Sequence, residues 1–162
     1  MSIEKNIGYF FFDKSHLKRA LRHVSYPIDP LLDQSLDGIP EIPDPPFNQM
    51  GYGVLGRSLL ESVVAEFGIR SGCHTPLDLA QQRLTILDPQ RLQTLLDTLC
   101  LEFYVKVGSL EKDQGLTQDF STLEETFMAV LGAVYFDGGY MSMRRVVKQL
   151  LVDPVLGDLE AD

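Results

Sequence analysis

The chain is poor in cysteine, has no long hydrophobic run, and has too few basic residues to offset its acidic ones. Its two cysteines, Cys73 and Cys100, form neither a CxxC pair nor a zinc-binding spacing with histidine, so we expect reduced thiols and no zinc site. No apolar stretch is long enough to cross a bilayer, and the apolar run at residues 7–12 is too short for a secretory signal. We therefore expect a cytoplasmic protein without membrane association.

The deficit of basic residues limits which ligands the protein can bind. Fourteen Lys and Arg face 23 Asp and Glu, which gives a net charge of −9. A protein that holds phosphates through its overall field needs a basic surface, whereas this field repels nucleic acid on average. Any contact with nucleic acid must then be local or supplied by a partner. The acidic residues gather at 29–44 and in the C-terminal tail, which we expect to be solvated segments.

The residues that are present predict one all-α domain spanning 1–162. A hydrophobic fraction of 44% is enough for a single core. Apolar residues recur at helical spacing in several segments, and no useful β-alternation occurs. We expect helices from about residue 13 or 15 onward and at about 51–68, 77–85, 89–99, 122–136 and 140–151.

Local signals place several of the helix ends. Asp88-Pro89 combines an N-cap with a proline at the first helical position, and Ser121 or Thr122 is the expected N-cap of the next long helix. Asp137-Gly138-Gly139 should stop that helix, and its small residues, Ala129, Gly132 and Ala133, predict a close helix crossing. Six of the nine prolines lie at 27–47, which predicts a Pro/Asp-rich loop, and a short acidic tail is expected at 152–162.

Four segments in order resemble the catalytic domain of the ribonuclease III family. Residues 7–13 are similar to its opening turn, and 20–26 (ALRHVSY) to the end of its first helix. Residues 54–60 (VLGRSLL) resemble the second half of its signature helix, and 127–139 (FMAVLGAVYFDGG) its late helix and turn. The resemblance implies a helical bundle, usually a homodimer. The 27–47 segment is longer than the family's usual link, and we expect no double-stranded-RNA-binding domain after residue 151.

The resemblance also implies a metal site, from which this sequence departs. Family members cut double-stranded RNA with Mg²⁺ held by four carboxylates, one pair on each of two helices. The matching positions here are Gly53, Arg57, Glu125 and Met128, and only Glu125 is a carboxylate. A guanidinium cannot ligate Mg²⁺ and a thioether is a poor ligand for a hard cation, so we expect no metal, no cofactor and no catalysis.

Arg57 introduces a positive charge where the family holds its metal ion. We expect it to form an ion pair with Glu124 or Glu125, replacing the metal as a link between the two helices. The alternative is a pair with Glu61, one turn further along the same helix, or exposure to solvent.

Two basic faces and one apolar face are candidate binding surfaces. The basic residues Lys14, Lys18, Arg19 and Arg22, with His23, and the set Arg144, Arg145 and Lys148 on the outside of the last helix, are candidates for contact with RNA phosphates. With a net charge of −9, the alternative is that both are solvated helix faces. The apolar members of the signature helix predict a homodimer interface formed by Tyr52, Val54, Leu55 and Leu59.

These observations support three hypotheses about function. The first is a catalytically inactive ribonuclease III-like protein of RNA metabolism that acts as a dimeric binding or scaffold domain on structured RNA or a ribonucleoprotein. The second is an active Mg²⁺-dependent double-stranded RNA endonuclease without a double-stranded-RNA-binding domain. The third is a protein-interaction module with no RNA role.

Overall fold

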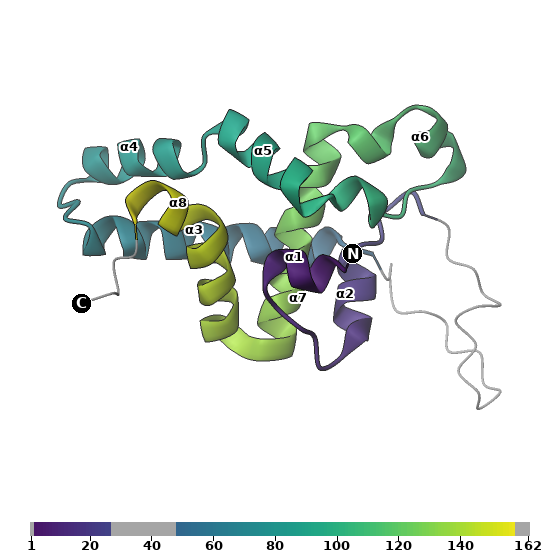
Figure 1. Ribbon diagram of the computed structural model, residues 1–162, viewed down its shortest axis with the longest axis horizontal. Coiled ribbons are helices and arrows are strands. Elements are labelled where there is room, and N and C mark those ends of the chain that lie inside the picture. The colour runs from purple at the N-terminus through teal and green to yellow at the C-terminus, as the bar shows by residue number, and fades with distance from the viewer. Residues whose placement is uncertain (1, 27–47, 158–162) are drawn as a thin grey trace.

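The computed structural model describes residues 2–26 and 48–157, and within them the chain is helical with no strand. This confirms the predicted all-α fold, whereas the loop predicted at 27–47 and residues 158–162 lie outside the described part. Figure 1 shows α3 along the long axis, α4 and α5 as a layer above it, and α7 crossing the middle. The elements are α1 (Ile3–Ile7), α2 (Lys14–Ala20), α3 (Met50–Arg70), α4 (Pro76–Ile86), α5 (Pro89–Leu99), η1 (Leu101–Phe103), α6 (Ser109–Asp113), η2 (Leu116–Gln118), α7 (Phe120–Val147), η3 (Lys148–Val152) and α8 (Asp153–Leu156).

The crossing of α3 and α7 is the centre of the fold, and two glycines make it close. A Cβ atom at Gly56 would lie 1.8 Å from the carbonyl oxygen of Met128, and one at Gly132 would lie 2.3 Å from that of Tyr52. The two backbones are therefore in direct contact, which confirms the close crossing predicted from the small residues of the late helix.

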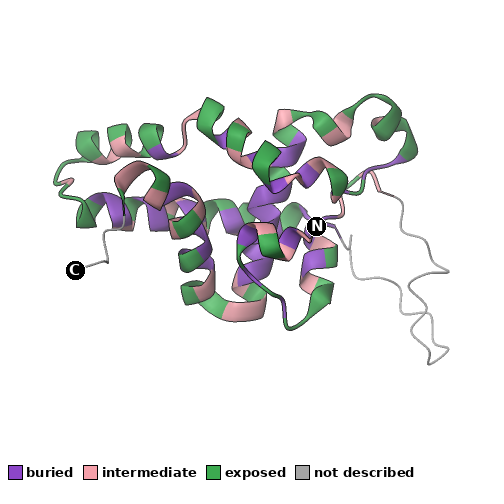
Figure 2. Cartoon of the chain, viewed as in Figure 1, coloured by how far each residue is buried: buried purple, intermediate pink, exposed green. Residues whose placement is uncertain are grey.

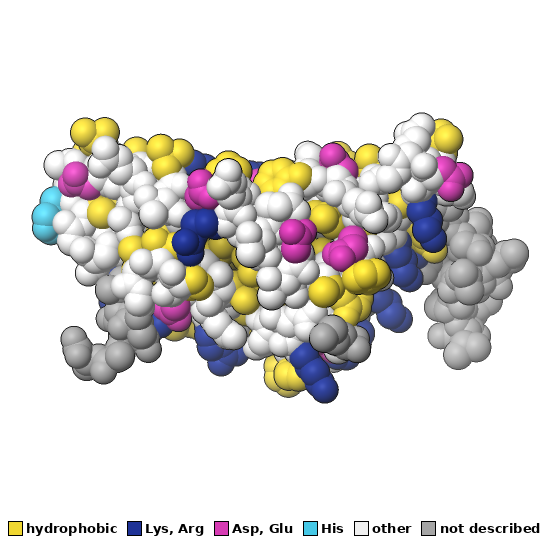
Figure 3. Space-filling model, turned by 45° about the horizontal axis from the view of Figure 1, so that its top comes forward, with side chains coloured by type: hydrophobic (Ala, Val, Ile, Leu, Met, Phe, Trp, Pro, Cys, Tyr) yellow, Lys and Arg dark blue, Asp and Glu magenta, His cyan; other side chains and the backbone are white. Residues whose placement is uncertain are grey.

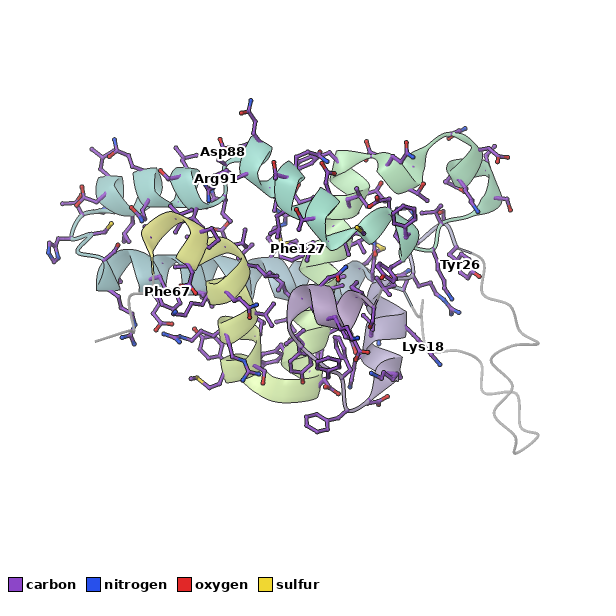
Figure 4. The ribbon with its side chains drawn as sticks, in the orientation of Figure 1. Lys18, Tyr26, Phe67, Asp88, Arg91 and Phe127 are labelled. Carbon is purple, nitrogen blue, oxygen red and sulfur yellow. The ribbon has the colours of Figure 1, made fainter. Side chains whose placement is uncertain are left out.

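The core follows the predicted helical spacing. Figure 2 shows the buried residues concentrated along α7 and the inner faces of α3 and α5. Phe67 of α3 and Phe127 of α7 are fully buried, and Figure 4 places both within the interior of the bundle. Burial of large aromatic side chains provides much of the stabilisation of such a core.

The helix ends agree with the sequence in one case and differ in another. Asp88 caps α5 as predicted, since its carboxylate accepts hydrogen bonds from the backbone N–H groups of Gln90 and Arg91. The prediction of Ser121 or Thr122 as the cap of α7 was wrong. Asp119 takes this role, with its carboxylate accepting from the Thr122 N–H at 3.0 Å. The backbone at Asp119 is extended, so its carboxylate can reach the N–H group of Thr122, three residues later. This is the ordinary N-cap geometry.

A carboxylate in the predicted helix-stop sequence attaches the N-terminal segment to α7. Asp137 accepts hydrogen bonds from the Tyr9 hydroxyl at 2.7 Å, from the Phe12 N–H at 2.9 Å and from the Asp13 N–H at 2.8 Å. The predicted stop is present as a break at Gly139, whose φ of 75° and ψ of 179° are not helical. The short helix α1, which was not predicted from the sequence, contributes the buried side chains of Ile3 and Ile7 to the core.

The C-terminal part departs from the expected acidic tail. Val152 is buried, Asp153–Leu156 forms α8, and Val155 and Leu156 pack against the core. The prediction of a tail from residue 152 was therefore wrong for 152–156, because the apolar residues of this stretch belong to the core. None of the helices in the described ranges is long and apolar enough to pass through a lipid bilayer.

Candidate functional site

A pocket of about 350 Å³ opens between α3 and α7. All four positions that correspond to metal ligands by resemblance, Gly53, Arg57, Glu125 and Met128, line it, so the two helices bring them together. Its other lining residues are His23, Val24, Gln49, Met50, Val54 and Ser58.

The donor set of this pocket does not fit a magnesium ion. Glu125 is exposed, Met128 is buried, and Gly53 brings no side chain. Mg²⁺ requires oxygen ligands in near-octahedral geometry, and one carboxylate beside a guanidinium does not provide them. In the part of the chain that the structure describes, no group of three or more His, Cys, Asp and Glu side chains is arranged to hold a metal ion.

Arg57 forms an ion pair across the two helices. Its Nη1 donates to Oε1 of Glu124 at 3.1 Å, and the two side chains are 49% and 24% exposed. The structure thus has the predicted inter-helix pair with Glu124. The alternative partner, Glu61, is engaged by Arg83, whose Nε donates to it at 2.6 Å.

Gln49 is the most deeply buried polar side chain of the pocket, and it was not among the site residues predicted from the sequence. Gln49 is 3% exposed, and its Oε1 accepts from the Thr126 hydroxyl at 3.1 Å. Its Nε2 has no hydrogen-bond partner among the described residues. The signal that could have found it is its spacing, because Gln49 precedes Gly53 by one helical turn and so shares its face.

The first predicted basic face adjoins the pocket. The Gln49 N–H donates to the Arg22 carbonyl at 2.9 Å, and Arg19 Nε donates to the Asn48 carbonyl at 3.2 Å. His23 lines the pocket, with Nδ1 2.9 Å from the Ser25 hydroxyl.

The cations of this face differ in how far they extend into solvent. Lys18 is exposed and projects away from α2 in Figure 4, whereas Lys14 pairs with Glu4. The Arg19 guanidinium lies 4.7 Å from the centroid of the Tyr52 ring, and the Arg22 guanidinium lies 5.5 Å from that of Tyr26. On the face drawn in Figure 3, several basic side chains lie at the right-hand end, and others are spread over the left half and the lower edge.

The prediction that the second basic set lies on the outside of the last helix was wrong for Arg144. This residue is 8% exposed, its Nη2 and Nε donate to the Glu66 carboxylate at 2.9 and 3.1 Å, and its guanidinium lies over the ring of Phe67. The hydrogen bonds from Arg144 lower the pKa of Glu66 to about 2. Lys148 is also largely buried and pairs with Asp153 at 3.0 Å. The physical reason is that α7 lays its final turns against α3, so this face meets an acidic residue rather than solvent.

The predicted dimer face needs a similar correction at Tyr52. Its side chain is only 8% exposed, its hydroxyl lies 2.7 Å from His16 Nδ1, and its ring stacks on that of Phe136 with centroids 4.8 Å apart. Tyr52 therefore belongs to the interior, because it is on the face of α3 that crosses α7. Val54 is 71% exposed, and Leu55 and Leu59 are partly exposed.

Comparisons with known proteins agree with this geometry. Curated relatives include the Ribonuclease 3 of Syntrophotalea carbinolica, 30% identical over 151 residues, and that of Magnetococcus marinus, 30% identical over 156 residues. They are matched over 93% and 96% of this chain, which spans about three-fifths (60% and 61%) of their length. The solved nuclease domain of ribonuclease III from Campylobacter jejuni superposes with a TM-score of 0.76 at 20% identity, covering 94% of this chain and 95% of that one. Residues 13–155 match the family described as Ribonuclease-III-like, and the chain belongs to that family.

Proposed function

We propose that this chain is a non-cleaving member of the ribonuclease-III-like family that acts as a dimeric binding or scaffold domain for structured RNA or a ribonucleoprotein. One observation is the main support for the proposed loss of cleavage. The pocket where the family's ligand positions converge holds an arginine, a methionine and a glycine in place of three carboxylates.

The Arg57–Glu124 pair supports this proposal. In an active site of this kind, metal ions neutralise charge on the phosphate and generate the attacking hydroxide. Here a guanidinium already neutralises a neighbouring carboxylate at 3.1 Å. The remaining carboxylate, Glu125, cannot position a metal ion alone.

A cleavage assay tests the proposal directly. Duplex RNA is incubated with the purified protein in Mg²⁺ and in Mn²⁺, with the Ribonuclease 3 of Syntrophotalea carbinolica as the positive control. We expect no turnover by this protein and no heat of binding for Mn²⁺ in titration calorimetry. Metal-dependent cleavage at a rate that scales with protein concentration and is lost in Glu125→Gln would establish the alternative, an active endonuclease.

A restored variant makes the negative result informative. Gly53→Glu with Arg57→Asp and Met128→Glu returns carboxylates to all four positions. A Cβ atom at Gly53 would meet only the Glu125 carbonyl, at an ordinary 3.6 Å, so a side chain fits there. We expect the triple variant to gain Mn²⁺ affinity, whereas the control Arg57→Lys, which keeps the positive charge, should not. Equal Mn²⁺ binding by the unaltered protein would contradict the proposal.

The exposed face of α3 supports the dimer. Val54, Ser58 and Ser62 form one stripe along α3, and both hydroxyls donate back to backbone carbonyls four residues earlier, at 3.1 and 3.0 Å. The stripe therefore presents an uncharged surface whose polar groups are already satisfied, which favours burial against a partner. The solved nuclease domain of ribonuclease III from Campylobacter jejuni is reported to be structurally flexible in the region that is involved in its dimer formation.

Light scattering tests the dimer. We expect twice the monomer mass at micromolar concentration, and the monomer mass for Val54→Arg, because burying an unpaired guanidinium in an interface is costly. Leu84→Arg, an equally apolar and exposed position on α4, is the matched control and should remain dimeric. A monomer mass for the unaltered protein would contradict this part of the proposal.

A further inference from the structure

We propose that the pocket between α3 and α7 binds a single unpaired base of an RNA strand. This inference rests on the proposed RNA role and names the part of the RNA that the former metal site contacts. It assigns to the pocket a recognition function in place of the cleavage that its side chains do not support.

The walls of the pocket suit a flat, apolar ligand. Val24 and Met50, which lie outside the proposed dimer face, are exposed around it, and the buried thioether of Met128 contributes to the lining. Apolar and thioether side chains pack against the face of an aromatic ring with little dependence on its identity. A volume of about 350 Å³ is at the lower end of the range for small-molecule sites.

The amide of Gln49 distinguishes a base from a purely apolar occupant. One end of this amide is held by Thr126, and the other has no hydrogen-bond partner although the residue is only 3% exposed. This amide nitrogen is already buried and unpaired, and an aliphatic or phenyl occupant would leave it so, which is unfavourable, whereas an occupant with a hydrogen-bond acceptor could satisfy it. The edge of a base offers both donors and acceptors to an amide, whichever way the amide is oriented.

The charges beside the pocket suit the phosphates that flank a base. Arg57 has five N–H donors, of which Nη1 is engaged with Glu124. On the other side, the backbone of Arg22 contacts that of Gln49, and Arg22 lies beside Lys106 over the ring of Tyr26. Cations on both sides of an apolar pocket can hold a strand while one base inserts.

Fluorescence of a base analogue tests insertion. A hairpin RNA carries 2-aminopurine at one unpaired position, and a fully paired duplex carries it within the stem. Insertion changes the stacking of the analogue, so we expect a fluorescence change with the hairpin and none with the duplex.

Glycine substitutions on α3 supply matched variants. Gly53→Leu places a side chain in the pocket, Gly53→Ala adds only a Cβ that fits, and Gly51→Leu adds the same side chain where nothing lies within 4 Å. We expect Gly53→Leu to abolish the fluorescence change and to weaken hairpin binding about tenfold, the effect of removing one stacked base. Gly53→Ala and Gly51→Leu should bind within about twofold of the unaltered protein.

Substitution of the amide gives a second measurement. Gln49→Met keeps the length of the side chain and removes its polar end, so hairpins differing only in the unpaired base should bind with more nearly equal affinities than they do to the unaltered protein. Unchanged base preference would contradict a role for the amide and overturn the proposal.

The outcomes separate this inference from the proposed function. Equal hairpin affinity and fluorescence in Gly53→Leu and the unaltered protein would overturn base binding and leave the RNA role standing. Loss of the dimer in Gly53→Leu with RNA binding intact would assign the pocket to a second copy of the chain and would also overturn it. Failure of the unaltered protein to bind any RNA would overturn both.

Discussion

Two arginines bound to glutamates illustrate how burial decides the role of an ion pair. Arg57 and Glu124 meet at 3.1 Å at the surface, where such pairs contribute about 0.2–1 kcal/mol. Arg144 binds Glu66 through two nitrogens while largely buried, and Arg70 and Tyr140 also donate to the same carboxylate. Replacing the residues of the first pair should therefore change the free energy of unfolding little, whereas the second pair is part of the core.

Stability against acid should depend on Glu66. Hydrogen bonds from Arg144 outweigh the opposing effect of burial and lower the pKa of Glu66 to about 2 from its usual 4.5. A lowered folded-state pKa stabilises the protein fully above pH 4.5, and this contribution is lost as the pH falls from 4.5 toward 2. In urea titrations, the unaltered protein should lose about 2–3 kcal/mol more over this range than Glu66→Gln does. Parallel pH profiles for the two proteins would contradict the prediction.

At the scale of elements, the contact between α3 and α7 depends on the absence of two side chains. Gly56→Ala would place a methyl group 1.8 Å from the Met128 carbonyl oxygen, so the helices must separate. We expect this substitution to lower the free energy of unfolding by about 3 kcal/mol or more, as other severe overpacking does.

Gly51 supplies the control on the same helix. Nothing lies within 4 Å of a Cβ there, so Gly51→Ala should raise the free energy of unfolding by about 0.5–1 kcal/mol through helix propensity. Thermal and urea unfolding of both variants would check the contrast. Similar effects of the two substitutions would show that the close contact between α3 and α7 does not limit the stability of the protein.

Asp137 joins the N-terminal segment to α7 and should control its local stability. Burial raises the pKa of Asp137, but hydrogen bonds from the Asp13 N–H, the Tyr9 hydroxyl and the Phe12 N–H outweigh it and hold this pKa below 3.8. Burial and the same carboxylate raise the pKa of Tyr9 to about 12.

Asp137→Ala should therefore open the N-terminal segment before the rest of the molecule. We expect the variant to be less stable by about 1–3 kcal/mol, with hydrogen exchange accelerating first at the Phe12 and Asp13 amides. Acceleration spread evenly over the bundle would indicate instead that Asp137 supports the whole core.

At the scale of the whole molecule, the acidic charge is unevenly placed along the chain. Eight of the 23 acidic residues and none of the 14 basic ones lie in 27–47 and 158–162, so the other residues together carry a net charge of −1. The described bundle is thus close to neutral. This removes part of the electrostatic objection to RNA binding that the net charge of −9 raised.

Charge reversal at Lys18 tests the proposed contact between RNA and this bundle. Lys18→Glu should weaken binding of a structured RNA and lower the slope of log affinity against log salt by about 1 for each phosphate that the variant no longer binds. Lys112→Glu, which makes the same change on α6, should leave the slope unaltered. An equal decrease in affinity and slope for both variants would mean that only overall charge matters.

Sequence alone predicted the features that depend on local chemistry. Helical spacing predicted the long helices, and Asp88-Pro89 predicted the start of α5. The residue types at 53, 57, 125 and 128 led us to expect no Mg²⁺, and this stays a prediction. The resemblance to ribonuclease III aligned these positions, although it left Gln49 unnoticed.

The tertiary structure decided which face of each helix is covered. Spacing does not say whether a basic turn meets solvent or an acid on another helix, so Arg144 and Tyr52 were expected outside and lie inside. The choice between Glu124, Glu125 and Glu61 as the partner of Arg57 likewise depended on how α3 and α7 cross. That crossing is set by the contact of two glycine backbones far apart in the sequence, and local patterns carry no information about such a contact.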